Sequence, residues 1–260
     1  MNPLFGRRHF LTAVGAVTAT TAIATANGAS VAHASPAAPR IRATKVRPFP
    51  LSAVTLLDSP FRDNQSRNTA YLRFVDIDRL LHTFRLNVGL PTDAEPCGGW
   101  EGPNVELRGH STGHLMSGLA LTYANTGEEA LREKGARLVE ALAECQAASP
   151  AAGFNAGYLS AFPESFFDRL EDRTDVWAPY YTIHKIMAGL IDQHRLAGNN
   201  QALEVVLRQA EWVDTRTAKL SHEQMQAVLN TEFGGMNDMF ADLHAVTGDA
   251  RWLEVAERFS

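Results

Sequence analysis

The sequence has little of three features that define particular classes of protein. It contains only two cysteines, Cys97 and Cys145, whose spacing matches neither a disulfide framework nor a zinc site, so we expect both to be unpaired. After the N-terminal segment, no stretch reaches the ~20 apolar residues that a membrane-spanning helix requires. Positive charge is also scarce, because the first 34 residues hold two of the 24 basic residues and none of the 29 acidic ones, which leaves 22 basic against 29 acidic. A mildly acidic surface disfavours nucleic acid and anionic membrane as partners.

The first 34 residues have the features of an export signal. Arg7 and Arg8 precede a weakly apolar Ala/Val/Thr stretch, and Ala32-His33-Ala34 is a small-residue cleavage site. The paired arginines resemble a twin-arginine signal peptide, so we expect the mature protein to be secreted by twin-arginine export. Residues 35–48 are rich in Pro, Ala and Arg and lack periodicity, which is typical of a linker. The folded part is therefore predicted to be residues 49–260.

A weak internal repeat organises the folded part. Three times, an apolar helix rich in small residues ends at a glycine (Gly127, Gly198 or Gly248), and a more charged helix follows at once. Glycine suits the left-handed residue that ends a helix. We interpret the first helix of each pair as inner and the second as outer. Apolar residues at helical spacing also predict a helix over 63–88, whereas 49–61 suggest a short extended segment.

Loop lengths favour one of the two architectures that such a repeat allows. Alternating inner and outer helices form either an open solenoid or a closed α/α toroid. The long loops, roughly 89–110, 148–180 and 219–236, all precede an inner helix and would gather at one rim, over the N-termini of the inner helices. This asymmetry predicts an all-α fold, a closed toroid of helical hairpins, of which this chain supplies about four hairpins.

The residues expected at this rim are polar and aromatic, as a carbohydrate site requires. Aromatic side chains stack on sugar faces, and His and Glu side chains bond hydroxyl groups or transfer protons. A glycine pair before the third inner helix would let the backbone approach a ligand closely. The candidate substrate-binding residues are Trp100, Glu106, His110 and His114 from the first loop, Trp177, Tyr181 and His184 from the second, and Glu232 and Asn237 from the third.

Several of these candidates also have a structural interpretation. His110 and His114 have the i,i+4 spacing of metal ligands but lack the adjacent Glu of the zinc-protease motif, so we assign no metal site to them. Capping and packing at the helix start is their plainer role. The Phe residues of the second loop suit a hydrophobic plug at the end of the barrel as well as a sugar subsite, and Glu232 suits a helix cap or a solvated surface position.

The combined motifs resemble those of a known family. Trp100-Glu101-Gly102 precedes Leu107-Arg108-Gly109-His110-x-x-Gly-His114, followed by Tyr181-x-x-His184-Lys185 and then Glu232-Phe233-Gly234-Gly235-Met236-Asn237. Together they are similar to the β-L-arabinofuranosidase-like glycoside hydrolases of families 127 and 146, formerly a domain of unknown function, DUF1680. The similarity runs from about Phe49 to the last residue.

The resemblance implies an (α/α)6 catalytic barrel followed by β-sandwich domains, which removes arabinofuranose from plant-derived glycans with retention of configuration. It also implies a cysteine nucleophile held with further cysteines and a glutamate around zinc. Neither Cys97 nor Cys145 matches that cluster, so we assign no catalytic residue and no cofactor within this chain, and expect the nucleophile beyond Ser260 and zinc in the full-length enzyme. A substrate-contact role carries over to His184, and more loosely to His110 and Glu232.

The expected partner is therefore an oligosaccharide or polysaccharide, and the 260-residue chain is expected to be inactive and marginally folded by itself, with an apolar face exposed on the last inner helix. Two other functions stay open. Another α/α-toroid glycan enzyme, such as a polysaccharide lyase or an unsaturated uronyl hydrolase, would share the architecture. A helical-repeat protein that binds carbohydrate without catalysis would share the repeat.

Overall fold

The structure is a computed structural model that describes residues 48–231 and 235–260. The predicted signal peptide and nearly all of the predicted linker lie outside the described residues. The described part is helical and contains no strand. Its elements are η2 (Leu51–Ala53), α1 (Pro60–Phe74), α2 (Ile77–Asn87), η3 (Gly99–Glu101), α3 (His110–Thr126), α4 (Glu129–Ala148), α5 (Ser165–Glu171), α6 (Pro179–Ala197), α7 (Asn200–Thr217), α8 (His222–Thr231), α9 (Met236–Thr247) and α10 (Arg251–Arg258).

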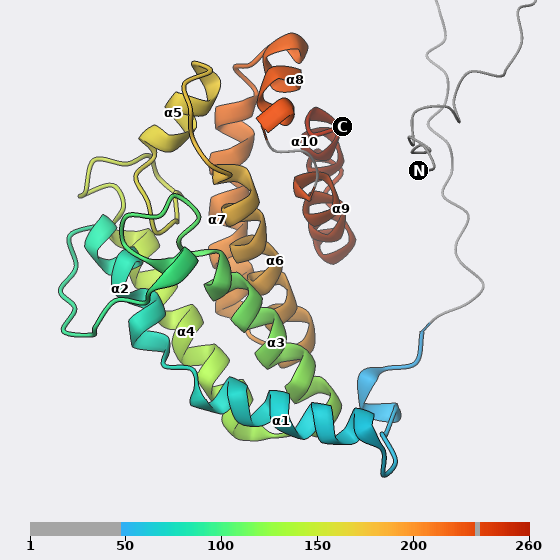
Figure 1. Cartoon of the computed structure of the whole chain (residues 1–260). Helices are drawn as coiled ribbons and strands as arrows, with labels where there is room; N and C mark the ends of the chain where they lie inside the picture. The colour runs from blue at the N-terminus through green and yellow to red at the C-terminus, as the bar shows by residue number, and fades with distance from the viewer. Residues whose placement is uncertain (1–47, 232–234) are drawn as a thin grey trace, which may run out of the picture. The chain divides into compact units, whose positions relative to one another are not determined.

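Three helical hairpins, α3–α4, α6–α7 and α9–α10, stand side by side and form part of an α/α toroid (Figure 1). The first helix of each hairpin ends at Gly127, Gly198 or Gly248, with φ of 71°, 68° and 74°. These left-handed values are open to glycine at little cost, because glycine has no Cβ to clash with the following carbonyl. The three predicted helix ends are therefore confirmed.

The inner helices α3 and α6 pack backbone against backbone. A Cβ on Gly113 would lie 2.1 Å from the carbonyl oxygen of Lys185, and one on Gly189 would lie 2.5 Å from the carbonyl oxygen of Gly113. The amide of Gln193 donates to the carbonyl oxygen of Met116 at 2.8 Å, one to two turns further along. The two helices thus run parallel and in register. Their N-termini meet at the same end of the hairpins, where the long loops also lie.

The predicted helix over 63–88 is wrong as a single element. The structure breaks it into α1 and α2 at Val75, and Asp76 caps α2 by accepting the N–H of Asp78 at 2.9 Å. At the break, Lys134 of the outer helix α4 donates through Nζ to the carbonyl oxygens of Leu72 and Arg73, both at 2.8 Å. The apolar spacing that predicted one helix combined Tyr71 and Phe74, which are exposed on α1, with the buried apolar residues of α2, so periodicity alone did not reveal the break.

The expectation of an exposed apolar face on the last inner helix is also wrong. The large apolar side chains of α9 are buried, among them Met239, Phe240 and Leu243, and Phe240 stacks on Trp252 of α10. Exposed large hydrophobic side chains lie mostly in the segment before α1 and on α1 itself; they are Phe49, Leu51, Val54, Leu56, Leu57, Phe61, Tyr71 and Phe74. The large apolar side chains of α9 are therefore covered within the described residues, with α10 and α6 packed against this helix.

Candidate functional site

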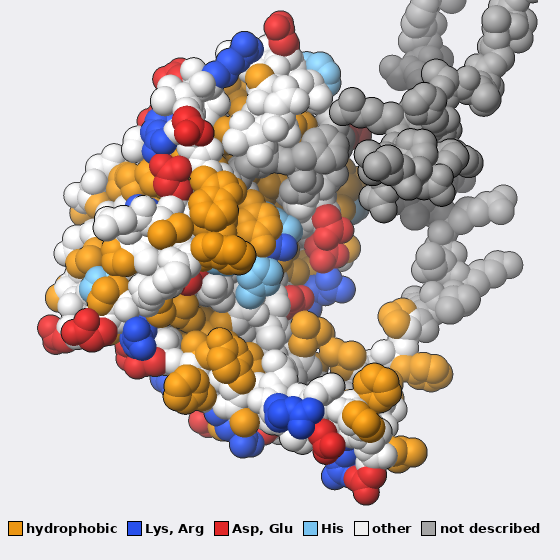
Figure 2. All heavy atoms as spheres, in the orientation of Figure 1, with side chains coloured by type: hydrophobic (Ala, Val, Ile, Leu, Met, Phe, Trp, Pro, Cys, Tyr) orange, Lys and Arg blue, Asp and Glu red, His pale blue; other side chains and the backbone are white. Residues whose placement is uncertain are grey.

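Five side chains from two inner helices and one loop form a chain of ring contacts at the predicted rim. Ring centroids lie 6.2 Å apart for Trp100 and His110, 5.9 Å for His110 and His114, 6.2 Å for His110 and Tyr181, and 6.5 Å for Tyr181 and His184. We call these five residues the rim cluster. Figure 2 shows histidine side chains beside a group of hydrophobic side chains on this face of the molecule. The parallel register of α3 and α6 brings the cluster together.

Glu101 lies beneath the rim cluster and ties its loop to the start of α3. The side chain is buried, and one carboxylate oxygen lies 2.7 Å from Nδ1 of His110. The same carboxylate accepts the N–H groups of Gly109 at 2.6 Å and Ser111 at 2.8 Å. Burial alone raises the pKa of a carboxyl group, but these hydrogen bonds outweigh burial, and the pKa of Glu101 is lowered. Sequence reasoning did not assign Glu101 to the site.

The pKa values of the three histidines of the rim cluster are shifted in different directions. Burial lowers the pKa of His110, but the hydrogen bond to Glu101 and its negative charge raise it more, and the net pKa is raised. Burial, followed by the positive charges of Lys185 and His110, lowers the pKa of His114. Burial and Lys185 lower the pKa of His184 to about 4, although Asp238 opposes this. The rim therefore holds one imidazole whose pKa is raised and two whose pKa values are lowered.

His184 is held against the start of the third inner helix. A Cβ on Gly235 would lie 2.6 Å from Nδ1 of His184, so the glycine backbone packs directly on the imidazole ring. Within the described residues, that buried Nδ1 has no hydrogen-bond partner. Asn237 is half-buried in the first turn of α9, where its Oδ1 accepts the N–H of Asp238 at 2.9 Å. Glu232 lies outside the described residues.

Glu106 and Trp177 are joined to each other instead of to the rim cluster. The Glu106 carboxylate accepts from Nη1 of Arg169 and from the backbone N–H of Trp177, both at 2.7 Å. It therefore ties the first long loop to the second. Trp177 is 48% exposed and Trp100 is 66% exposed, so both residues are accessible to a ligand.

The sequence allowed the phenylalanines of the second loop to form either a hydrophobic plug or a sugar subsite. In the structure they pack as a plug. Phe162 and Phe167 are fully buried, and Phe162 stacks on the half-buried Phe166 with centroids 4.7 Å apart. Arg108 packs over Phe162 and Phe166 and donates through Nε to the carbonyl oxygen of Ala161 at 2.8 Å. These side chains seal the end of the hairpins and are not available to a sugar.

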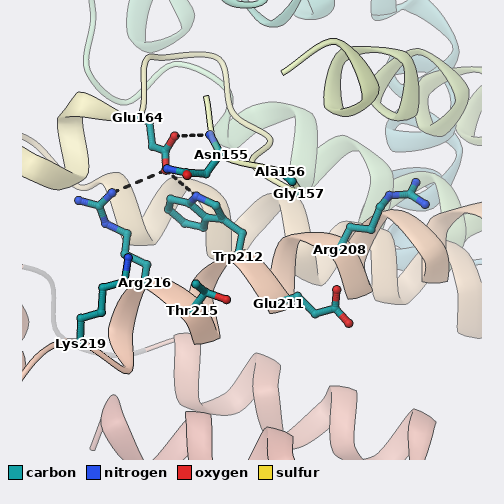
Figure 3. Close-up of a pocket in the computed structure, with 10 residues that line it drawn as sticks. All are labelled: Asn155, Ala156, Gly157, Glu164, Arg208, Glu211, Trp212, Thr215, Arg216 and Lys219. Atoms are coloured by element: carbon teal, nitrogen blue, oxygen red, sulfur yellow. Dashed lines mark hydrogen bonds and ion pairs between the residues drawn. The ribbon is translucent and has the colours of Figure 1, made fainter. Parts of the chain in front are cut away.

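A pocket lies between α7 and the second long loop, and no residue of the rim cluster lines it (Figure 3). Its buried carboxylate, Glu164, accepts from the backbone N–H and the side-chain amide of Asn155, both at 2.8 Å, and from Nε1 of Trp212 at 2.7 Å. Arg216 lies 3.7 Å from the same carboxylate. Since these groups satisfy one another, the cluster anchors the second loop on α7.

The described residues offer no ready metal site or thiol nucleophile. No group of three or more His, Cys, Asp or Glu side chains among them has the geometry to hold a metal ion. Cys97 is half-buried and Cys145 is buried, and neither forms a disulfide. Burial raises the pKa of both thiols, that of Cys145 to about 12, so both stay protonated near neutral pH. In the described part of the chain, no helix is both long and apolar enough to cross a bilayer.

Exposed indoles and a group of imidazoles at the rim of an α/α toroid are side chains that suit a carbohydrate ligand, as in the class of carbohydrate-active enzymes. The comparisons with known proteins place the chain within this class. Residues 53–260 match the family model of the β-L-arabinofuranosidase GH127 catalytic domain, and the chain belongs to this family of glycoside hydrolases. No curated protein compared with the chain shows significant similarity to it.

Two solved structures share the fold. A GH127 β-L-arabinofuranosidase from Geobacillus stearothermophilus T6 matches with a TM-score of 0.58 and 14% identity, over 79% of this chain and 32% of that one. The GH127 β-arabinofuranosidase BT3674 matches with a TM-score of 0.53 and 14% identity, over 82% of this chain and 33% of that one. The chain therefore spans about a third of the length of the solved structures it matches.

Proposed function

We propose that this chain forms the sugar-binding rim of a β-L-arabinofuranosidase that acts on arabinofuranose-containing, plant-type glycans. The observation that carries this proposal is the convergence of the rim cluster at the N-termini of α3 and α6. An exposed indole such as Trp100 can stack on a sugar ring, and neutral imidazoles such as His114 and His184 can accept hydrogen bonds from hydroxyl groups. We also propose that the protein is exported by the twin-arginine route.

The zinc that the family resemblance implies does not fit the residues of this chain. A cysteine-rich zinc site needs several thiolates close together. Cys97 lies before α3 and Cys145 near the end of the outer helix α4, and no donor cluster gathers around either among the described residues. Our proposal for the 260-residue chain is binding of substrate without cleavage of the glycosidic bond.

The test is to purify residues 35–260 and measure two properties. We expect no release of arabinose from an aryl β-L-arabinofuranoside with added zinc. We also expect saturation-transfer NMR to detect binding of methyl β-L-arabinofuranoside, and Trp100→Ala to abolish that signal. Phe61→Ala is the matched control, because Phe61 is 73% exposed but lies on α1, away from the rim cluster.

Zinc-dependent turnover would contradict the proposal that the chain binds substrate without cleaving the glycosidic bond. Equal binding by wild type and Trp100→Ala would contradict the proposed site. Preference for a different sugar, such as an unsaturated uronide, would favour the alternative toroid enzymes.

A further inference from the structure

The first turn of α3 takes its cap from a distant residue in the preceding loop. The N-cap residue is Gly109, with φ of 99°, and it has no side chain with which to accept an N–H. The carboxylate of Glu101, eight residues earlier, accepts the N–H of Gly109 and that of Ser111 instead. A negative charge at this position also interacts favourably with the helix dipole.

The carboxylate does more than cap the helix, because its third contact is to the imidazole of His110. Nδ1 of His110 points at two acceptors, Oε1 of Glu101 at 2.7 Å and the carbonyl oxygen of Leu107 at 2.8 Å. Two acceptors on one nitrogen require a proton there and fix the plane of the ring. The His110 side chain is only 9% exposed, so the imidazole is a buried part of the wall.

The other rim residues depend on that ring for their placement. Trp100 is tilted against it, His114 meets it edge-on with an interplanar angle of 89°, and Tyr181 is tilted against it from the neighbouring helix α6. All three have more exposed surface than His110 and would face a ligand first. A change in the orientation of the His110 ring would therefore alter the shape of the whole site.

We propose that Glu101 is the positioning residue of this rim. Through its ion pair with the buried imidazole of His110, it sets the orientation of the residues that meet an arabinofuranosyl ring. The identity of the ligand rests on the proposed function, whereas the contact between Glu101 and His110 does not depend on it. Glu101 acts through His110 and does not touch the sugar.

The charged and titratable groups around the His110 ring are few. Burial lowers the pKa of His110, Glu101 from the loop raises it, and the positive charge of Lys185 from α6 lowers it. His114 lies one turn further along α3. Burial lowers its pKa, and the positive charges of Lys185 and His110 lower it further. Removal of the Glu101 charge leaves the opposing charge of Lys185 in place, so we expect the proton affinity of the ring to fall and the ring to lose one of the two acceptors that fix its plane.

The experiment is an NMR titration of the imidazole groups in the full 260-residue chain. In the wild type, we expect His110 to keep its proton to higher pH than His114 and His184. Glu101→Gln should lower the proton affinity of His110 by roughly tenfold or more, because an opposite charge at this distance favours the charged form strongly. Glu101→Asp keeps the charge and should recover part of the effect.

Glu106→Gln is the matched control, since Glu106 lies in the same loop and is ion-paired at 2.7 Å, but to Arg169. It should leave the titration of His110 unchanged. An unchanged His110 in Glu101→Gln, or an equal shift in Glu106→Gln, would overturn the inference. If Glu101→Gln does not fold, the wild-type titration decides alone: a His110 ring that is neutral at lower pH than His114 would overturn it.

The same samples separate this inference from the proposed function. Binding of methyl β-L-arabinofuranoside should weaken at least severalfold in Glu101→Gln, in step with the change at His110. If the wild type binds no arabinofuranoside but the His110 titration shifts as expected, the proposed function fails and the positioning role of Glu101 stands. Unweakened binding in a Glu101→Gln chain whose His110 has shifted would overturn the positioning role.

Discussion

Replacement of Gly113 by alanine tests whether the close contact of α3 and α6 builds the site. The new Cβ would lie 2.1 Å from the carbonyl oxygen of Lys185 and 2.6 Å from the backbone nitrogen of Ile186. Both are backbone atoms of a buried helix, so no side-chain rotation relieves the clash. To restore an ordinary contact, the two helices must separate by about 1 Å.

The expected loss of stability follows from this geometry. Overpacking of a close-packed core costs about 1–3 kcal/mol. Separation of the helices also weakens the hydrogen bond from Gln193 to Met116, which contributes about 1 kcal/mol. The helix propensity of alanine offsets these losses by about 1 kcal/mol. We therefore expect a net loss of about 2 kcal/mol, and in a domain of this size a fall in Tm of about 4–8 °C.

The assay is a thermal melt followed by circular dichroism, with Gly118→Ala as the control in the same helix. A Cβ on Gly118 would lie 3.2 Å from a terminal methyl of Leu72, a side chain that can move by a few tenths of an ångström. We expect this control to change the unfolding free energy by less than about 1 kcal/mol. A Gly113→Ala variant that melts with the wild type, or a control that falls as far, would refute the reasoning.

Three further predictions concern other parts of the chain. Lys134→Met should lower the unfolding free energy measured in urea by about 2 kcal/mol, because three carbonyl groups around the end of α1 lose a charged donor; the exposed Lys219→Met should have little effect. The folded pKa of His184 is about 4 against 6.5 for the free side chain, so its contribution to stability is complete above pH 6.5 and is lost as the pH falls towards 4; His184→Phe should flatten the decline of Tm over that window, and parallel curves would contradict this. Replacement of Arg7 and Arg8 by lysine should block export of a fused reporter, and undiminished export would show that the twin-arginine assignment is wrong.

The helical hairpins and their ends were readable from the sequence because they depend on local physics. A glycine such as Gly127 ends a helix through its own φ, and an apolar stripe requires only residues three and four positions apart. The family motifs likewise lie in short continuous segments. The break between α1 and α2 was missed because its partner, Lys134, comes from α4, some sixty residues later in the chain.

The partners within the site were decided by the tertiary structure. Glu101 contacts His110 only because its loop folds back over the start of α3, although a hint existed in the sequence: a helix that begins after Gly109 needs a capping group from elsewhere. Tyr181 reaches His110 because Gly113 allows α3 and α6 to approach closely and in register. Residue types and helix ends are local properties that a sequence records directly. Which side chains meet across the rim depends on the spacing of two helices far apart in the chain, and that spacing is set by packing.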